Sequence, residues 1–360
     1  MREVMNHFNA STLFAPTLSH TSAQRAENDR IPARRKRNNK RIEVKMGHGG
    51  TLDPMASGVL VLGIMNGTKQ LQEYLTGTKT YEAVALFGCA TDTYDALGKV
   101  IKTAPWEQVT RERVERELEG FRGEVMQKPP LYSALHHEGK RYYEYAREGK
   151  PLPVEIQARP VTAVEMELVG YTDAHEYKFP REEVSEEVKM EAEALGMEME
   201  MKAKGENKQQ PAKPEEASAE TVGTVETAQT GAKRPPPSLS SPSNQHPKKQ
   251  KFAANPIIAD TLFTPSLSTS SPPTSPPQNP PIAALRMSVS KGFYVRSLVY
   301  DLGDAMGSAA HMVKLVRTQQ GQWVLGRNVF EWEDIVGQPE EKWGGRIERA
   351  LRVWERERRA

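Results

Sequence analysis

A short glycine-rich stretch carries the residues of this sequence that are best suited to chemistry. Residues 45–63, KMGHGGTLDPMASGVLVLG, place His48 and Asp53 among five glycines, just before an apolar run. Glycine lets a backbone approach a ligand closely, so the Asp53 carboxylate is a candidate catalytic group. An aspartate before a proline is also a common helix N-cap, with Pro54 at the first helical position. The Asp-Pro pair alone therefore does not identify a catalytic residue.

Arg296 is the second candidate, because it falls in the first turn of a predicted helix that follows the segment KGFY. Helix N-termini favour anions, so an arginine there needs a negative partner, either a carboxylate across a site or an RNA phosphate. An exposed, snorkelling arginine is the plain alternative. His48, Tyr81, Tyr294 and Leu315 have ordinary interpretations by themselves: a loop histidine, two core or surface aromatics and a core leucine.

The rest of the sequence limits the kind of chemistry. A single cysteine, Cys89, in 360 residues excludes a disulfide framework and a multi-cysteine metal site. The sequence contains no Walker-type phosphate loop, dinucleotide glycine fingerprint, zincin histidine pair or paired-cysteine zinc site. We therefore expect no metal and no cofactor, and a reaction carried out by side chains alone. No apolar run approaches the roughly 20 residues of a membrane-spanning helix, so we expect no membrane partner.

Composition divides the chain into structured and unstructured parts. A hydrophobic content of 37% and a mean hydropathy of −0.65 are too polar for a fully packed chain of this length, so we expect part of it to be unfolded. Residues 1–45 predict a basic, partly disordered segment, in which RRKRNNKR at 34–41 carries six cations in eight positions. Such a block is typical of nucleic-acid contact or of nuclear import. Residues 180–280 are acidic and then rich in serine and proline, which predicts a low-complexity disordered insertion.

Loop-closure entropy grows only with the logarithm of length, so this insertion can interrupt one domain without dividing it. We expect that domain to consist of residues 46–179 and 281–335, followed by a basic C-terminal helix or tail at 336–360. Apolar patterns predict strands at 58–65, 79–88, 160–171 and from 284 onward. They predict helices at 68–75, 109–121 and 295–306.

Two local signals support these elements. Thr110 is the expected N-cap of the second helix. Alternation of Val164, Met166 and Leu168 with glutamates indicates a half-exposed strand. Strands and helices follow one another without strict βαβ alternation, so we predict an α+β fold.

Four segments taken together resemble one known family. They are GHGGTLDPMASGVLVLGIMNGTKQLQEYL, KTYEAVALFGCATDTYDALGKV, QKPPLYSALHHEGKRYYEYAREGKPLP and SKGFYVRSLVYDLG. In this order they are similar to the TruB family of pseudouridine synthases, and most of all to its eukaryotic tRNA pseudouridine-55 branch. The resemblance covers nearly all of the predicted ordered segments and stops at the insertion. It implies the pseudouridine synthase catalytic fold, with a mixed and mainly antiparallel sheet.

The resemblance also implies a reaction. The T-loop uridine at tRNA position 55 becomes pseudouridine when the C1′–N1 bond breaks and C1′ rejoins the ring through C5, without a cofactor or a metal. The target base must first flip out of the RNA stack. Asp53 occupies the position of the family's catalytic carboxylate. It either attacks C1′ as a nucleophile or removes the 2′ proton to give a glycal, and the sequence does not decide between these routes.

Five further residues match the family's substrate-binding positions. His48 would stack into the space that the flipped nucleotides leave, and Tyr81 would lie against the target uracil and help proton transfer at C5. Tyr294 and Arg296 stand in the family's G-x-Y-x-R pattern, in which the arginine pairs with the catalytic aspartate. Leu315 would close the pocket under the base.

The sequence departs from the family in two places. Residues 1–45 lack the opening strand with its Lys-Pro pair, so we expect the natural chain to be longer than this one. Bacterial relatives also carry a C-terminal RNA-binding domain, for which the residues after Trp332 leave no room. RNA binding is therefore expected from the catalytic domain and the basic segments.

Two other functions fit parts of the sequence. One is a guide-dependent pseudouridine synthase, which would need the C-terminal domain. The other is a non-catalytic RNA-binding or RNA-folding protein, which loss of the first strand could produce. The expected partners are the T-arm stem-loop of tRNA and messenger RNA with similar hairpins, with no guide RNA, and the protein is expected to be a monomer. The expected location is the nucleus, the mitochondrion or the cytoplasm.

Overall fold

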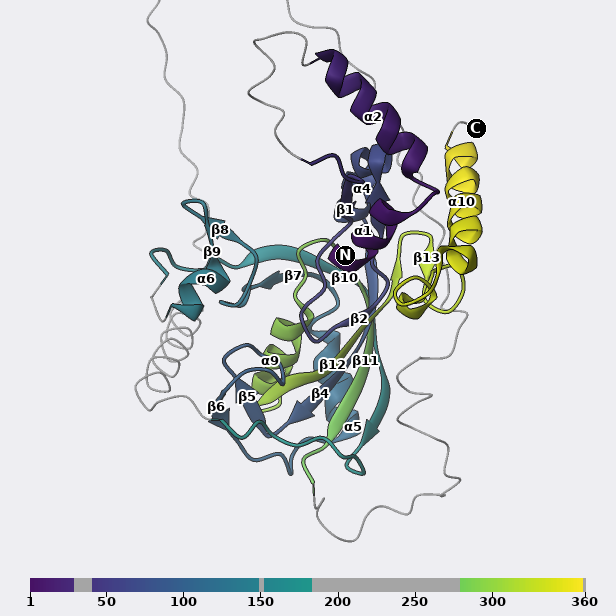
Figure 1. The fold of residues 1–360 in the computed structure, drawn as a ribbon. Coiled ribbons are helices and arrows are strands. Elements are labelled where there is room, and N and C mark those ends of the chain that lie inside the picture. Colours follow the sequence, from purple (N-terminus) through teal and green to yellow (C-terminus); the bar gives the residue numbers. More distant parts are fainter. Residues whose placement is uncertain (29–40, 149–151, 183–278, 359–360) are drawn as a thin grey trace, which may run out of the picture. The chain divides into compact units, whose positions relative to one another are not determined.

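The computed structural model describes residues 1–28, 41–148, 152–182 and 279–358 (Figure 1). Most of the basic run at 34–41 and of the predicted insertion at 180–280 lies outside the described residues, so the predictions for both are not tested.

A mainly antiparallel sheet forms the centre of the fold, and its strand order is β13-β12-β4-β11-β10-β7. The first three strands are β13 (Trp323–Val324), β12 (Ala310–Gln320) and β4 (Lys79–Phe87). The other three are β11 (Ile282–Val289), β10 (Arg159–Thr172) and β7 (Gly123–Gln127). A short strand, β2 (Ser57–Gly58), pairs in parallel with β12, so the sheet is mixed. The predicted α+β fold is confirmed.

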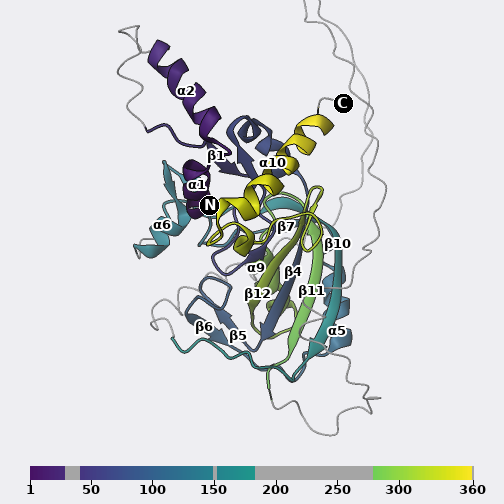
Figure 2. The ribbon, with the colours of Figure 1, turned by 45° about the vertical axis from the view of Figure 1, so that its right-hand side comes forward.

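Strands that lie far apart in the sequence pair directly in this sheet. Thr172, the last residue of β10, pairs with Ile282, the first residue of β11. The segments on the two sides of residues 183–278 therefore complete one sheet. Figures 1 and 2 show β10, β11, β4 and β12 side by side.

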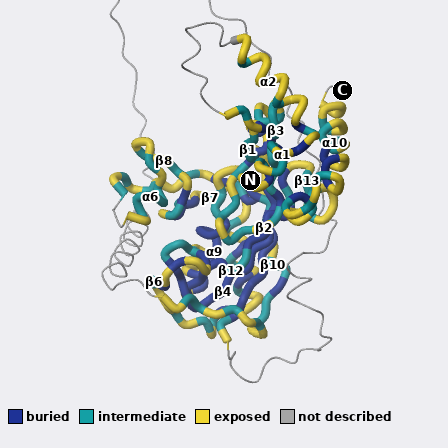
Figure 3. Tube along the Cα trace, viewed as in Figure 1, coloured by how far each residue is buried: buried dark blue, intermediate teal, exposed yellow. Residues whose placement is uncertain are grey.

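Two helices cover one face of the sheet, α5 (Arg111–Glu119) and α9 (Val295–Ala305). Thr110 caps α5 as predicted, because its side chain accepts a hydrogen bond from the backbone N–H of Arg113. Val114 and Leu118 of α5 are fully buried against the sheet. Figure 3 shows the buried residues concentrated in β4, β12 and α9. This packed layer gives the site residues a rigid support.

The apolar run at 58–65 differs from its prediction as one buried strand. The chain leaves β2 at Gly58, and β3 (Leu62–Ile64) then pairs with β1 (Met46–His48) in a separate two-stranded sheet. Gly58 has a φ of +100°, a conformation that glycine favours and that ends the short strand. The predicted helix at 68–75 is divided into a 3₁₀ turn, η1 (Met65–Gln70), and α4 (Leu71–Thr76).

The alternation predicted for β10 is also interrupted. Val164 is 59% exposed, although the pattern placed it on the same face as Met166. The pairing with β11 shifts register between Ala163 and Glu165. Such an irregularity adds a residue to one strand and turns the following side chains to the other face.

The N-terminal segment, predicted as basic and partly disordered, contains two helices, α1 (Arg2–Ala10) and α2 (Ala15–Asn28). Val4 and Phe8 of α1 are buried against Trp343 and Ile347 of α10 (Glu340–Glu357). Their i, i+4 spacing places both apolar side chains on one helical face, a signal that the charge-based prediction overlooked.

The remaining elements are short. They are β5 (Cys89–Thr91), β6 (Val100–Thr103), β8 (His136–His137), β9 (Lys140–Arg141), α6 (Tyr142–Arg147) and η3 (Trp332–Asp334). Within the described ranges, no helix combines the length and the apolar character that crossing a bilayer requires.

Candidate active site

Asp53 and Arg296 form an ion pair between the glycine-rich loop and the first turn of α9. Arg296 donates from Nε to Oδ2 of Asp53 at 2.8 Å and from Nη2 to Oδ1 at 3.3 Å. The arginine side chain is 5% exposed, whereas the Asp53 side chain is 28% exposed. Asp53 is thus the negative partner that an arginine at a helix N-terminus requires. The buried guanidinium fixes both carboxylate oxygens and leaves the carboxylate accessible.

The loop at 92–95 and Tyr132 hold the other side of the Arg296 guanidinium. Nη1 donates to the carbonyl oxygen of Thr93 at 2.8 Å, and Nη2 donates to that of Tyr132 at 3.1 Å. A second carboxylate, Asp95, lies 3.7 Å from Nη1. The Asp95 side chain is 4% exposed and its pKa is raised, chiefly because burial disfavours its charged form. Arg296 therefore has a fixed position before any substrate arrives.

Arg317 of β12 fastens the loop that carries Asp53. Its guanidinium donates to the carbonyl oxygens of Val59 at 2.6 Å, Gly50 at 3.2 Å and Thr51 at 3.4 Å. The Arg317 residue is 1% exposed. Hydrogen bonds to both sides of residue 53 restrict the loop to one conformation, which pre-organises the carboxylate.

Gly58 allows β12 to approach this loop closely. A Cβ atom at position 58 would lie 2.3 Å from the carbonyl oxygen of Arg317. The neighbouring N–H of Val59 donates to that same oxygen at 2.8 Å. The glycine is thus required by a contact with β12 as well as by its positive φ.

Tyr81 and Leu315 lie on neighbouring strands and on the same face of the sheet. Tyr81 of β4 pairs with Arg317 of β12, and Leu315 pairs with Ala83. Burial raises the pKa of the Tyr81 phenol; the charge and the hydrogen bond of Arg317 oppose this rise, and the nearby charge of Asp53 adds to it. The phenol is therefore neutral at physiological pH. The uncharged Tyr81 ring and the 4%-exposed Leu315 form an apolar wall on this face of the sheet.

Tyr294 is the N-cap residue of α9 and is held through its backbone. Its N–H donates to Oε1 of Gln127 at 2.7 Å, and its carbonyl oxygen accepts from Nε2 of Gln127 at 2.9 Å. Burial raises the pKa of the Tyr294 phenol as well, whereas the nearby positive charges of Arg159 and Arg296 lower it. The clamp by Gln127 fixes the start of α9 and with it the position of Arg296.

His48 lies in β1, opposite Leu62, at the start of the same loop. Its Nδ1 is buried and has no hydrogen-bond partner among the described residues. The structure therefore brings Asp53, Tyr81, Tyr294 and Arg296 together, and Leu315 lies on the same face of the sheet as Tyr81. Among the described residues, His48 forms no hydrogen bond or ion pair with any of them.

Comparison with known proteins assigns the chain to a family. A profile of the TruB family pseudouridylate synthase N-terminal domain matches residues 34–195. The chain is 40% identical over 344 residues to tRNA pseudouridine synthase 4 of Schizosaccharomyces pombe, a match that covers 93% of this chain and 77% of that protein. The chain belongs to the TruB family of pseudouridine synthases.

Two further relatives show how the similarity is distributed. The chain is 32% identical to tRNA pseudouridine synthase 4 of Saccharomyces cerevisiae, over 98% of this chain and 80% of that protein. With tRNA pseudouridine synthase B of an Azoarcus species the identity is 49%, but over 36% of this chain and 43% of the bacterial one. The similarity to the two yeast proteins thus covers 93% and 98% of this chain, whereas the similarity to the bacterial protein covers 36% of it.

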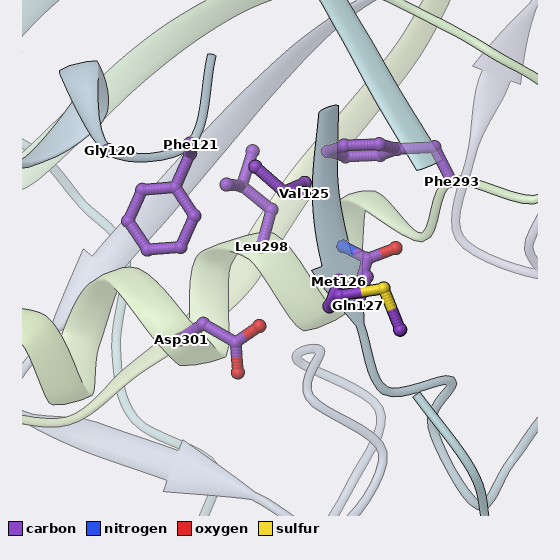
Figure 4. A pocket seen from close by; sticks show the side chains of 8 residues that line it. All are labelled: Gly120, Phe121, Val125, Met126, Gln127, Phe293, Leu298 and Asp301. Carbon is purple, nitrogen blue, oxygen red and sulfur yellow. The ribbon is translucent and has the colours of Figure 1, made fainter. Parts of the chain in front are cut away.

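A cavity of about 300 Å³ lies beside the candidate site (Figure 4). It is lined by Gly120, Phe121, Val125, Met126, Gln127, Phe293, Leu298 and Asp301. None of the six predicted site residues lines it, and Gln127, which clamps Tyr294, is its connection to the site. Among the described residues, no group of three or more histidine, cysteine or acidic side chains could hold a metal ion.

Sequence analysis missed three positions that shape the site: Asp95, Tyr132 and Arg317. Asp95 and Tyr132 lie in loops outside the predicted helices and strands. Tyr132 and Thr93 bind Arg296 through their backbone carbonyl oxygens, and residue type does not indicate which carbonyl oxygens will be used. Arg317 follows Leu315 by two residues. β12 was not predicted as a strand. Had it been, this spacing of two residues would have placed the Leu315 and Arg317 side chains on one face.

Proposed function

We propose that this protein converts the T-loop uridine at position 55 of tRNA to pseudouridine, with Asp53 as the catalytic carboxylate. Membership of the TruB family supports the isomerisation, and the names of the two yeast relatives support tRNA as the substrate. One structural observation carries the assignment of Asp53: its carboxylate is accessible, yet both of its oxygens are fixed by the buried Arg296. A fixed group next to an apolar wall is suited to act on a bound nucleoside.

The proposed reaction needs no group from outside the protein and the RNA. The C1′–N1 bond breaks, the uracil ring turns, and C1′ bonds to C5. C5 then loses its proton, and N1 gains one. Asp53 acts on the ribose by one of two routes. It attacks C1′ and forms an ester bond that breaks when C5 attacks C1′, or it removes the 2′ proton to give a glycal and returns that proton when the C1′–C5 bond forms. Tyr81 supplies a neutral ring against the base and a hydroxyl group that can relay the C5 proton. Leu315 and Tyr294 complete the walls around the base.

RNA recognition follows from the same arrangement. The target base must leave its stack to reach Asp53, and His48, at the start of the loop that carries Asp53, would fill the space that it leaves. We propose a monomer that acts on the T-arm, and on messenger RNA with similar hairpins, without a guide RNA. The cellular location in the nucleus, mitochondrion or cytoplasm stays a prediction.

Replacement of Asp53 by asparagine tests the proposal. Asp53→Asn keeps the size of the side chain and removes the carboxylate. We expect pseudouridine formation in an unmodified tRNA transcript to fall by more than about 10³-fold, since a positioned proton-transfer group alone contributes 10²–10⁴. Binding of the transcript should change by less than about threefold, because phosphates supply most of the affinity.

Asp173→Asn is the matched control, because Asp173 is exposed and belongs to the 173–182 segment. It should keep the parent's activity. Mass mapping of the product locates the modified uridine, and turnover by Asp53→Asn at the parental rate would remove Asp53 from the mechanism. Activity of the parent only with an added guide RNA, or RNA binding without any product, would favour the guide-dependent enzyme or the non-catalytic protein.

A further inference from the structure

The C-terminal helix α10 is fixed to the catalytic unit along one side. Trp343 is 1% exposed, and its ring lies 5.5 Å from that of Phe8 in α1. Near the start of the helix, the Glu340 carboxylate accepts hydrogen bonds from the backbone N–H groups of Thr12 and Leu13 at 2.8 Å each. At the other end, Arg358 pairs with Glu73 of α4. Contacts at both ends make α10 a rigid element.

The two exposed flanks of α10 carry opposite charges. The basic flank consists of Lys342, Arg346, Arg349 and Arg356. The acidic flank consists of Glu341, Glu348 and Glu355. Neighbouring members of the basic flank are four, three and seven residues apart, and those of the acidic flank are seven residues apart. Each flank therefore forms one row, because a helix repeats its surface positions every three to four residues. All four cations are exposed.

Most of the basic flank has no carboxylate partner. Arg346 pairs with Asp334 at 3.1 Å. Lys342 donates to the amide oxygen of Gln338 at 2.9 Å. In the part of the chain that the structure describes, no carboxylate lies within ion-pair distance of Lys342, Arg349 or Arg356. On the acidic flank, Glu348 pairs with Arg352 of the same helix.

We propose that the basic flank of α10 binds phosphates of the RNA substrate. The row from Lys342 to Arg356 extends over about 21 Å at 1.5 Å per residue, long enough to follow several phosphates of one strand. Cations that lack carboxylate partners can form charge-assisted bonds to phosphate without breaking an ion pair within the protein. This inference rests on the proposed function, because it takes the substrate to be RNA.

The packing of α10 argues against a membrane as the partner. A basic amphipathic helix binds a membrane by inserting its apolar face below the headgroups. Here the apolar face is covered, since Trp343 and Ile347 are buried against α1. A long, rigid row of cations remains, and that is the feature a polyanion recognises.

The position of α10 links this surface to the catalytic loop. Its far end holds α4 through Arg358 and Glu73. The backbone carbonyl oxygen of Tyr74 in α4 accepts a hydrogen bond from Gln320, whose side chain also binds the carbonyl oxygen of Gly49. RNA bound along the basic flank is thus one helix away from the loop that carries Asp53.

A triple variant tests the inference: Lys342→Gln, Arg349→Gln and Arg356→Gln in the full chain. The matched control, Arg116→Gln, Lys178→Gln and Arg181→Gln, removes three exposed cations from α5 and the 173–182 segment. Both variants lose the same charge. The dissociation constant of an unmodified tRNA transcript is measured at several salt concentrations, and turnover is measured at saturating RNA.

We expect the α10 variant to bind at least tenfold more weakly at moderate salt. Its slope of log affinity against log salt should be smaller by about 2–3, from three lost phosphate contacts at roughly 0.7–0.9 each. Turnover at saturating RNA should stay within about twofold of the parent, and the control should keep the parental slope. Equal slopes in the two variants would overturn the inference. A parent that makes no pseudouridine but binds RNA through α10 would instead contradict the proposed function alone.

Discussion

Two carboxylates share the guanidinium of Arg296 at the centre of the site, and their surroundings differ. Asp53 contacts it at 2.8 Å and is 28% exposed, whereas Asp95 lies 3.7 Å away and is 4% exposed. Asp95 also accepts hydrogen bonds from the Thr93 hydroxyl at 2.7 Å and the Leu97 N–H at 3.0 Å. The exposed carboxylate can reach a substrate. The buried one can act only through Arg296, as a positioning residue.

Asp95→Asn should therefore slow catalysis and spare RNA binding. The amide keeps an acceptor for Thr93 and Leu97 but removes a negative charge beside Arg296, so the guanidinium holds Asp53 less firmly. We expect the single-turnover rate to fall by about 10- to 100-fold, a loss of roughly 1.4–2.7 kcal/mol in transition-state stabilisation. The dissociation constant for tRNA should stay within about threefold.

Asp92→Asn is the control for this prediction, because Asp92 belongs to the same loop but, among the described residues, forms no hydrogen bond or ion pair with Arg296. Its carboxylate instead accepts a hydrogen bond from the N–H of Lys99 at 2.8 Å. Equal rate losses in the two variants would show that general loosening of the loop, and not the charge near Arg296, is responsible.

At the scale of elements, the site depends on the contact between the glycine-rich loop and β12. The Arg317 side chain binds three carbonyl oxygens of the loop, and its backbone packs against Gly58. Two elements separated by more than 250 residues thereby fix the position of Asp53.

Gly58→Ala tests this contact. The added Cβ would meet the Arg317 carbonyl oxygen at 2.3 Å, and the φ of +100° is unfavourable for alanine. We expect the free energy of unfolding to fall by about 3 kcal/mol or more, the sum of backbone strain and a forced shift of the loop or strand. Pseudouridine formation should fall in the remaining folded protein. Urea denaturation measures the first effect.

Gly326→Ala separates strain from contact. Gly326 also has a positive φ, +72°, but a Cβ there would meet nothing within 4 Å. It should cost only about 1–2 kcal/mol of backbone strain and leave activity unchanged. If the two alanine variants lose the same stability, the contact with β12 is not what requires Gly58.

At the scale of the whole molecule, the central sheet contains a buried titratable group that makes stability depend on pH. His311 of β12 is fully buried, and its Nδ1 lies 2.8 Å from the carbonyl oxygen of Cys89. Burial lowers the pKa of the His311 imidazole below its ordinary value of 6.5, against smaller opposing effects of this hydrogen bond and of Asp95. The folded state therefore binds a proton less readily than the unfolded state.

The free energy of unfolding should consequently fall as the pH is lowered below about 6.5, where the unfolded chain begins to take up a proton that the folded one resists. The contribution of one histidine is at most about 1.4 kcal/mol per pH unit. His311→Gln removes the titratable imidazole and keeps a side-chain donor for the carbonyl oxygen of Cys89. Denaturation curves from pH 5 to pH 8 should show a shallower acid loss in this variant. An unchanged pH dependence would mean that other groups cause the loss.

Local patterns predicted the elements whose periodicity is complete within a short window. The apolar spacing of α9, the capped α5 and the apolar β4 and β11 were predicted from their own residues and are confirmed. Where the shape of an element depends on distant partners, the prediction was wrong or the element was not predicted. The exposed Val164 follows from a register shift against β11, and α1 is stable because Phe8 meets Trp343.

The sequence by itself determined the composition of the site, because the motif around Asp53 and the KGFY-x-R pattern are contiguous and specific. Only the tertiary structure decided how the site is held. Arg296 lies 243 residues from Asp53, and Asp95, Arg317 and two carbonyl oxygens complete its surroundings. Backbone carbonyl oxygens are common to all residues, and contacts across hundreds of residues arise only when the sheet forms. The candidate residues were therefore visible in the motifs and in their resemblance to one family, and their geometry only in the fold.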